Sequence, residues 1–232
     1  MLDQYKETIS TNEIIERVNK ENLYADFVNS QENGFFEFMN YVYDVIENLK
    51  NRAQISQFIE IRARIKDTDS AVKNFQKNKM LDDVFGIEII CANENEIHEI
   101  KKELEKTFKS TRSKFHNKEN GYKAWHESYS TKKGNNSTLA SHNVPAVECQ
   151  FKTIDVELNA EASHHDYKKV NKEEIQNKLN NETLIIGKQI PRMWVSRENG
   201  FYELQYKEII RRLYPFVDIT TIKEPEPKNK VI

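Results

Sequence analysis

The sequence predicts an α/β (α+β) fold, in which a mixed sheet is flanked by helices and extended by helices at both ends. Three patterns in the 232 residues predict this class. Apolar residues recur at helical spacing over 33–52 and 94–108. Apolar and charged residues alternate over 58–66, as in a strand with one buried face. Residues 84–91 are almost continuously apolar, which is typical of a strand inside a sheet.

The remaining elements follow from the same periodicities and from turn and capping residues. Asp67 to Asp69 are expected to cap the helix that follows the first strand. A polar loop separates two later strands and suits a long hairpin connection. A first helix is expected from residue 11, and further helices are expected over 33–52, 69–80, 94–108, 160–170, 172–179 and 199–214. Strands are expected over 58–66, 84–91, 122–129 and 144–153.

The chain is expected to form one structural domain in three parts. Residues 1–56 are N-terminal helices that pack on the core, residues 57–170 form the core, and residues 171–232 form a C-terminal helical extension and tail. Hydrophobic residues make up 38% and charged residues 31%, and 12 Phe and 10 Tyr supply large side chains for burial. This balance favours a folded protein with a heavily charged surface over a disordered chain.

Composition also excludes several classes of protein. The formal net charge is −2, so the chain has no global attraction for nucleic acid, and DNA is not an expected partner. No apolar run reaches the roughly 20 residues of a membrane helix, and the first residues lack the pattern of a signal peptide, so no membrane partner is expected. The two cysteines, Cys91 and Cys149, lie in apolar segments, which argues against a disulfide framework and favours the reducing cytoplasm.

Basic residues gather where the first strand meets the next helix. Arg64 and Lys66 lie two residues apart and therefore point off the same side of the strand. Ser70 and Lys73 follow at the start of the helix. Cations near a helix N-terminus can hold a polyphosphate. A solvated charged face is the alternative interpretation.

Two carboxylates stand on other strands. Asp83 lies directly before the apolar run, and Glu148 alternates with Gln150 and Lys152 on the polar face of the last strand. Two acids on neighbouring strands, opposite a cluster of Lys and Arg, supply the oxygen ligands and the charge neutralisation of a magnesium–triphosphate site. Taken alone, either acid is more often an ordinary edge carboxylate.

An aromatic residue lies at the start of the strand over 122–129. Tyr122 follows the Asn120–Gly121 turn, so it is placed to stack on a base, with His126 and Lys118 near the phosphates or hydroxyl of an acceptor. The alternatives are that Tyr122 packs on the core and that His126 is structural.

Five motifs, in one order, resemble the synthetase domain of the RelA/SpoT family. They are RIKDTDS (64–70), DVFG (83–86), KENGYKAWH (118–126), ECQFKT (148–153) and AEASHHDYK (160–168). The resemblance implies a nucleotidyltransferase-like fold, a mixed sheet of about five strands with helices on its faces. It also implies an enzyme that transfers pyrophosphate from ATP, as co-substrate, to a 3′-hydroxyl, with Mg²⁺ as cofactor.

The resemblance also implies roles for individual residues. ATP would contact Arg64, Lys66, Ser70 and Lys73. Asp83 and Glu148 would be the catalytic acids and the metal ligands, and Glu148 could instead be the base that deprotonates the hydroxyl. The residues that would surround the acceptor are Lys118, Asn120, Tyr122, His126, Gln150 and His164.

This chain departs from the family mainly around the acceptor. Glu88 and Lys152 stand where arginines are usual. Residues 110–117 lack the usual aspartate–tyrosine pair and contain Arg112 and Lys114 instead. These changes leave the ATP and metal side largely intact and alter the surroundings of the acceptor.

Two acceptors therefore stay open. With GDP or GTP as acceptor, the product would be (p)ppGpp, as for a small alarmone synthetase. The alternative is a toxin that pyrophosphorylates the 3′ CCA end of tRNA, blocks translation and is held in check by an antitoxin protein. A third hypothesis, an inactive nucleotide-binding regulatory module, is disfavoured because Asp83 and Glu148 are both present. A homo-oligomer is a further expected assembly, since small synthetases of this type often assemble.

Overall fold

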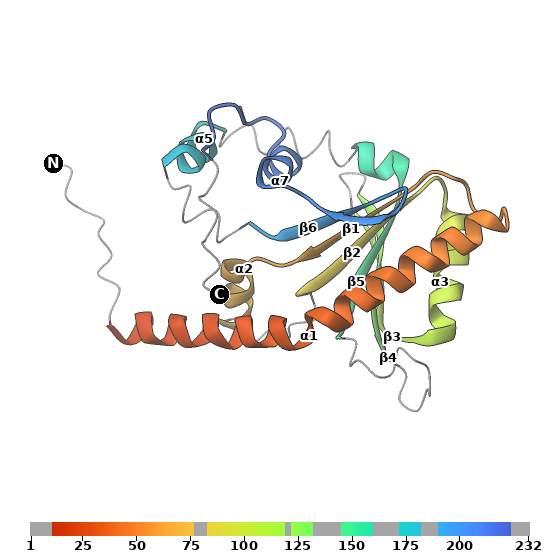
Figure 1. Ribbon diagram of the computed structural model, residues 1–232, viewed down its shortest axis with the longest axis horizontal. Helices are drawn as coiled ribbons and strands as arrows, with labels where there is room; N and C mark the ends of the chain where they lie inside the picture. The colour runs from red at the N-terminus through yellow and green to blue at the C-terminus, as the bar shows by residue number, and fades with distance from the viewer. Residues whose placement is uncertain are drawn as a thin grey trace.

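A seven-stranded sheet forms the centre of the computed structural model, which describes residues 11–76, 83–118, 122–131, 145–159, 172–181 and 190–223. The strand order is β3-β4-β5-β2-β1-β6-β7 (Figure 1). β2 and β5 are parallel, and every other neighbouring pair is antiparallel. The strands are β1 (Ile59–Ile65), β2 (Phe85–Cys91), β3 (Phe108–Asn117), β4 (Lys123–Thr131), β5 (Val147–Thr153), β6 (Arg192–Arg197) and β7 (Gly200–Glu203).

Helices lie before, between and after these strands, so the mixed α/β class is confirmed. The helices are α1 (Thr11–Asn51), α2 (Thr68–Gln76), α3 (Glu94–Thr107), α5 (Lys172–Asn181) and α7 (Tyr206–Leu213), and residues 154–159 add a short helical segment after β5. Asp67 caps α2 as predicted, because its Oδ1 accepts a hydrogen bond of 2.8 Å from the Ser70 backbone N–H. The helix expected over 160–170 lies outside the described residues.

The sheet has more strands than the five expected. β3, β6 and β7 were not predicted, and the helix expected over 199–214 is wrong for its first part, where Gly200–Glu203 form β7. β3 exposes most of its side chains, so it lacks the apolar alternation by which the other strands were found. β6 and β7 pair through a tight turn at residues 198–199, and Gly200 has a φ of 119°, which only glycine adopts readily.

α1 is one continuous helix of 41 residues, whereas two helices were expected. No proline interrupts it, and Gly34 near the expected boundary does not end it. Its buried stripe packs on the apolar face of the sheet, as Figure 1 shows for the part of α1 that crosses the strands. The stripe consists of Phe35, Phe38, Met39, Val42, Ile46 and Leu49.

The opposite side of the sheet, which we call the polar face, is where charged residues gather. Alternation along each strand sends apolar side chains toward α1 and α3 and polar ones to this face. Over β6 the polar face is covered by α7, because Val195 packs with Ile209. Within the described ranges, no helix combines the length and apolar character needed to cross a membrane.

Candidate active site

Strand register brings the predicted site residues onto the polar face in neighbouring rows. One row runs across β1, β2 and β5, because Arg64 is paired with Gly86 and Gly86 with Glu148. The next row contains Gln150 and His126, which are paired between β5 and β4. Residues separated by up to 86 positions in sequence are thereby collected on one surface.

The cationic end of this surface lies where β1 meets α2. Lys66 forms an ion pair with Asp83, and the Lys66 backbone carbonyl accepts a hydrogen bond from the Tyr24 hydroxyl of α1. Ser70 donates its backbone N–H to Asp67 at the start of α2. The side chain of Lys73 lies outside the described part of the structure.

Gly86 lets the Arg64 side chain lie flat across the neighbouring strand. A Cβ atom added at Gly86 would meet Arg64 Nε at 3.4 Å and Cγ at 3.5 Å. These are van der Waals distances, so the Arg64 side chain lies directly over the Gly86 backbone. Arg64 is thus held above β2 and toward Glu148, whose pKa its charge helps to lower.

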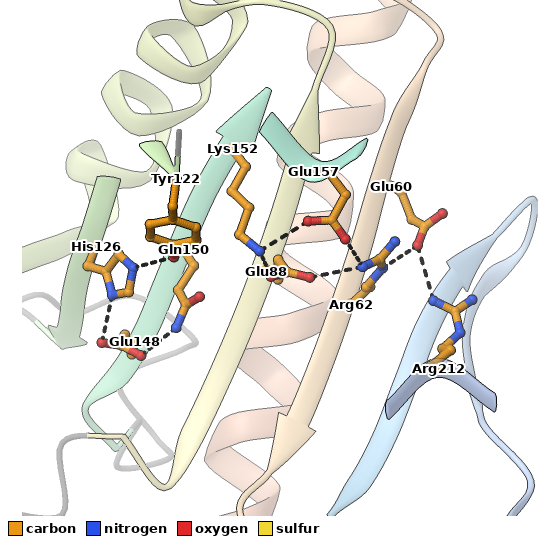
Figure 2. A network of polar contacts seen from close by, with 10 residues as sticks. All are labelled: Glu60, Arg62, Glu88, Tyr122, His126, Glu148, Gln150, Lys152, Glu157 and Arg212. Atoms are coloured by element: carbon orange, nitrogen blue, oxygen red, sulfur yellow. Dashed lines mark hydrogen bonds and ion pairs between the residues drawn. The ribbon is translucent and has the colours of Figure 1, made fainter. Parts of the chain in front are cut away.

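A chain of hydrogen bonds links Tyr122 to Glu148 through His126. The Tyr122 hydroxyl lies 3.0 Å from His126 Nε2, and His126 Nδ1 lies 3.2 Å from Glu148 Oε1 (Figure 2). Gln150 Nε2 donates a hydrogen bond of 2.9 Å to Glu148 Oε2. Lys118 Nζ lies 5.1 Å from the centroid of the Tyr122 ring, within cation–π range.

Glu148 is held in its ionised form. Burial raises the pKa of this carboxyl, but hydrogen bonds from His126 and Gln150 and the charges of His126 and Arg64 outweigh burial and lower the pKa to about 2. At neutral pH the group is therefore an anion in a partly enclosed setting.

Two carboxylates of the site could bind a divalent cation. Among the described residues, no group of three or more His, Cys, Asp and Glu side chains could hold a metal ion. Asp83, in the turn before β2, and Glu148, on β5, are hard oxygen donors. Mg²⁺ in proteins is often bound by one or two carboxylates together with substrate phosphates and water. This donor set therefore fits Mg²⁺ that arrives with a phosphorylated substrate.

Between Tyr122 and β6, a network of ion pairs occupies the middle of the polar face. We call Arg62, Glu88, Lys152 and Glu157 the central network (Figure 2). Lys152 forms ion pairs with Glu88 and, at 3.1 Å, with Glu157. Arg62 pairs with the same two carboxylates, and its distance to Glu88 is 3.2 Å. Glu60 then links Arg62 to α7, because Arg212 lies 3.3 Å from Glu60.

Charges inside the central network stabilise one another. Burial lowers the pKa of Lys152, but Glu88 and Glu157 outweigh burial and raise this pKa above its ordinary value. Lys152 Nζ also lies 5.7 Å from the centroid of the Tyr122 ring. The two departures from the family, Glu88 and Lys152, thus form a pair with each other beside the predicted acceptor site.

Sequence reasoning missed two residues of this face. Glu157 lies in the segment 154–159, where no periodicity marks it as a partner of Arg62 and Lys152. His116 lies on β3, and its ring centroid is 4.3 Å from that of His126. The alternation of Arg112, Lys114 and His116 was the signal that could have revealed this strand. Two predicted acceptor residues, Asn120 and His164, lie outside the described residues.

One family of known proteins matches the chain. The family model described as the region found in RelA/SpoT proteins matches residues 59–172. No curated protein sequence matches the chain.

Three solved structures of two bacterial proteins show some similarity to the chain. Small alarmone synthetase 1 from Bacillus subtilis is 20% identical, with a TM-score of 0.49 and coverage of 63% of this chain and 80% of that one. The same protein bound to its product pppGpp is 18% identical, with a TM-score of 0.49 and coverage of 72% and 92%. A GTP pyrophosphokinase family protein from Streptococcus pneumoniae is 15% identical, with a TM-score of 0.48 and coverage of 63% and 77%.

These structural likenesses are weak, so the family rests on the sequence match and on the motifs. Identities of 20% or less and TM-scores below 0.5 carry no argument about what this chain binds. The five motifs fall almost entirely within the matched region of 59–172. Residues 59–172, just under half of the chain, match the model of the region found in RelA/SpoT proteins, the family that the motifs predicted.

Proposed function

We propose that this protein is a pyrophosphokinase that transfers the β,γ-pyrophosphate of Mg-ATP to a 3′-hydroxyl, with GDP or GTP as the acceptor. The proposal rests on the surroundings of Glu148. This carboxylate is ionised and lies between the Arg64 guanidinium and the His126–Tyr122 pair. An anion at this position can face a cationic donor site on one side and a stacked acceptor on the other.

Arg64 and Lys66 are the groups assigned to ATP, with Arg64 near the adenine and Lys66 near the phosphates. Lys66 is paired with Asp83, so a phosphate that binds Lys66 would compete with Asp83 for this ammonium group. Mg²⁺, held by Asp83 and Glu148, would supply neutralisation of the phosphate charge. The acceptor's 3′-oxygen attacks the β-phosphorus, the bond from this phosphorus to the α,β-bridging oxygen breaks, and AMP leaves.

The low pKa of Glu148 bears on which group accepts the proton of the acceptor's 3′-hydroxyl. A carboxylate with a pKa of about 2 is a weak proton acceptor at neutral pH. We therefore assign Glu148 to cation binding and to orienting His126. His126 is the candidate base in its neutral form, in which Nδ1 donates its proton to Glu148 and Nε2, on the side of Tyr122, can accept the proton of the acceptor hydroxyl.

The 3′ end of tRNA is the second candidate acceptor. What supports it is the exposed basic surface of β3, where Arg112 and Lys114 flank the predicted acceptor site. A macromolecular anion can use charges that lie beyond the reach of a single nucleotide.

A transfer assay tests the proposal and separates the two acceptors. Purified protein is incubated with γ-labelled ATP and, in separate reactions, with GDP, GTP or deacylated tRNA. We expect label on GDP or GTP; label on tRNA alone would replace the first acceptor by the second. Transfer to none of them would contradict the enzyme proposal and favour the inactive module.

A matched pair of variants ties the activity to the site. Asp83→Asn removes one predicted metal ligand and should lower transfer by about 100-fold or more. Asp26→Asn makes the same chemical change at an exposed position of α1 and should leave transfer unchanged. Circular dichroism of both proteins shows whether the fold is kept.

A further inference from the structure

A row of basic side chains lies along β3, the strand at one edge of the sheet. The register of β3 on β4 pairs Arg112 with Ser128 and Lys114 with His126, and His116 follows two residues later. All three therefore project from the polar face, on the same side as Glu148. We call Arg112, Lys114 and His116 the β3 basic row.

A β-bulge places these residues on this side. The register shifts between Ser110 and Arg112, so one extra residue, Thr111, is inserted into β3. After the bulge, Phe115 falls on the other face, where its ring lies 4.5 Å from Trp125. Without the bulge, strict alternation would turn the basic residues away from the polar face.

The β3 basic row differs from the central network in its partners. Among the described residues, no carboxylate forms an ion pair with Arg112 or Lys114, and both side chains are exposed. Partial burial and the charges of His126, Lys114 and Lys118 lower the pKa of His116, which reflects a locally positive potential. In the central network, by contrast, Arg62 and Lys152 each have two carboxylate partners.

The row is continuous with the predicted acceptor site. His116 and His126 have ring centroids 4.3 Å apart, and His126 contacts Tyr122. Beyond His116, Lys118 lies over the Tyr122 ring. The three positions of the row are spaced by two residues, about 6.6 Å each, so the row extends for about 13 Å along the strand.

We propose that the β3 basic row is a phosphate-binding subsite for the acceptor, which takes the phosphate groups that the acceptor carries besides its reacting hydroxyl. The subsite rests on the proposed function, because it assumes that the acceptor stacks at Tyr122. The ligand is either the 5′-polyphosphate of a nucleotide or the phosphodiester backbone of a nucleic acid strand. The central network, where cations are already neutralised, is not available to these phosphates.

Binding measured without ATP tests the subsite independently of turnover. The full chain and the Arg112→Gln/Lys114→Gln double variant are titrated with GDP, GTP, guanosine and a fluorescently labelled single-stranded RNA 12-mer. The double variant should weaken binding of the phosphorylated acceptor by about 10-fold or more, because hydrogen bonds to charged groups contribute strongly. Guanosine, which carries no phosphate, should bind both proteins equally, and so should ATP at its own site.

Salt dependence distinguishes the two sources of phosphate. If the ligand is RNA, the slope of log K against log salt should be less steep in the double variant by roughly 1.4, which is about 0.7 for each lost phosphate contact. If the ligand is a nucleotide, GDP and GTP lose affinity and the RNA does not bind above background. Either result supports the subsite.

Lys123→Gln is the matched control. Lys123 is an exposed lysine of β4, but it precedes Ala124 and therefore points off the opposite face from His126. The proposal is overturned if Lys123→Gln weakens binding as much as the double variant, if the double variant binds like the wild type, or if it loses ATP as well. It is also overturned if none of the phosphorylated ligands binds the wild type. Transfer activity is measured separately, so loss of the subsite and loss of the enzyme proposal give different results.

Discussion

Two neighbouring parts of the polar face are equally rich in charge but differ in how that charge is balanced. In the central network, Lys152 and Glu157 are only 7% and 6% exposed, and each is paired with opposite charges. On the β3 basic row, Arg112 and Lys114 are exposed, and none of the described carboxylates forms an ion pair with them. The first region uses charge to hold strands and helices together, and the second leaves charge for a ligand.

This difference teaches that a strand of alternating charge does not by itself mark a binding surface. Arg62 and Arg64 share one face of β1. Arg62 forms ion pairs with Glu88 and Glu157, whereas Arg64 lies over Gly86 toward Glu148. What separates the two arginines is the partner on the neighbouring strand, which only the register reveals.

The largest loss of stability is expected when the central network is broken. Lys152→Met leaves Glu88 and Glu157 without one of their cations in a mostly buried setting, and it should lower the free energy of unfolding by about 3–5 kcal/mol. Lys114→Met on β3 should change it by less than about 0.5 kcal/mol. Urea unfolding followed by circular dichroism measures both. Similar values for the two variants would remove the distinction between the regions.

Tyr122 lies between the two regions and should affect the acceptor alone. Tyr122→Ala removes the stacking surface, so the KM for the acceptor should rise by a factor that corresponds to about 1–3 kcal/mol. The KM for ATP should not change, because Arg64 and Lys66 lie at the other end of the surface. Tyr202→Ala, at a half-exposed tyrosine of β7, is the control. Steady-state kinetics that show an equal rise for ATP would contradict this separation.

Acidic pH should weaken the central network. Burial raises the pKa of Glu157, but Lys152 and Arg62 outweigh burial and hold it below its ordinary value of 4.5. A carboxyl whose pKa is lowered in the folded state stabilises the fold above its unfolded pKa, and this contribution is lost as pH falls through the folded value. Glu157→Gln should therefore be less stable than the wild type by about 1–3 kcal/mol at pH 7, with a smaller difference near pH 3. A constant difference over this range would contradict the role of Glu157.

The smallest effect is expected at the rim of the network. Arg212 of α7 is partly exposed, and its ion pair is with Glu60, 3.3 Å away. Arg212→Ala should cost less than about 1 kcal/mol in unfolding free energy, as exposed ion pairs usually do. A loss as large as that of Lys152→Met would show that α7 is essential to the network, and the boundary drawn here between centre and rim would be wrong.

The sequence predicted the parts of the fold whose local pattern matches their environment. β1, β2 and β5 alternate or are continuously apolar because one or both of their faces are buried, and all three were found. β3 was missed because it lies at an edge with most side chains exposed, and its bulge interrupts the alternation. β7 was missed because four residues give no periodicity.

The candidate site was predictable in its members but not in its connections. The motifs identified Arg64, Lys66, Asp83, Tyr122 and Glu148. The register aligns Arg64 with Glu148 across Gly86, and side-chain contacts join Lys66 to Asp83 and connect Tyr122 to Glu148 through His126. Partners such as Glu157 depend on which strands become neighbours, and a single sequence does not contain that information. The roles assigned to these residues stay predictions.

The most direct test of the central claim follows each phosphate of ATP separately. ATP labelled at the α, β or γ position is incubated with the protein and the acceptor identified in the transfer assay, and the products are separated by chromatography. Pyrophosphate transfer predicts that β and γ labels both move to the acceptor and that the α label is recovered in AMP in equal amount. Transfer of the γ label alone, or release of labelled phosphate without an acceptor product, would contradict the account.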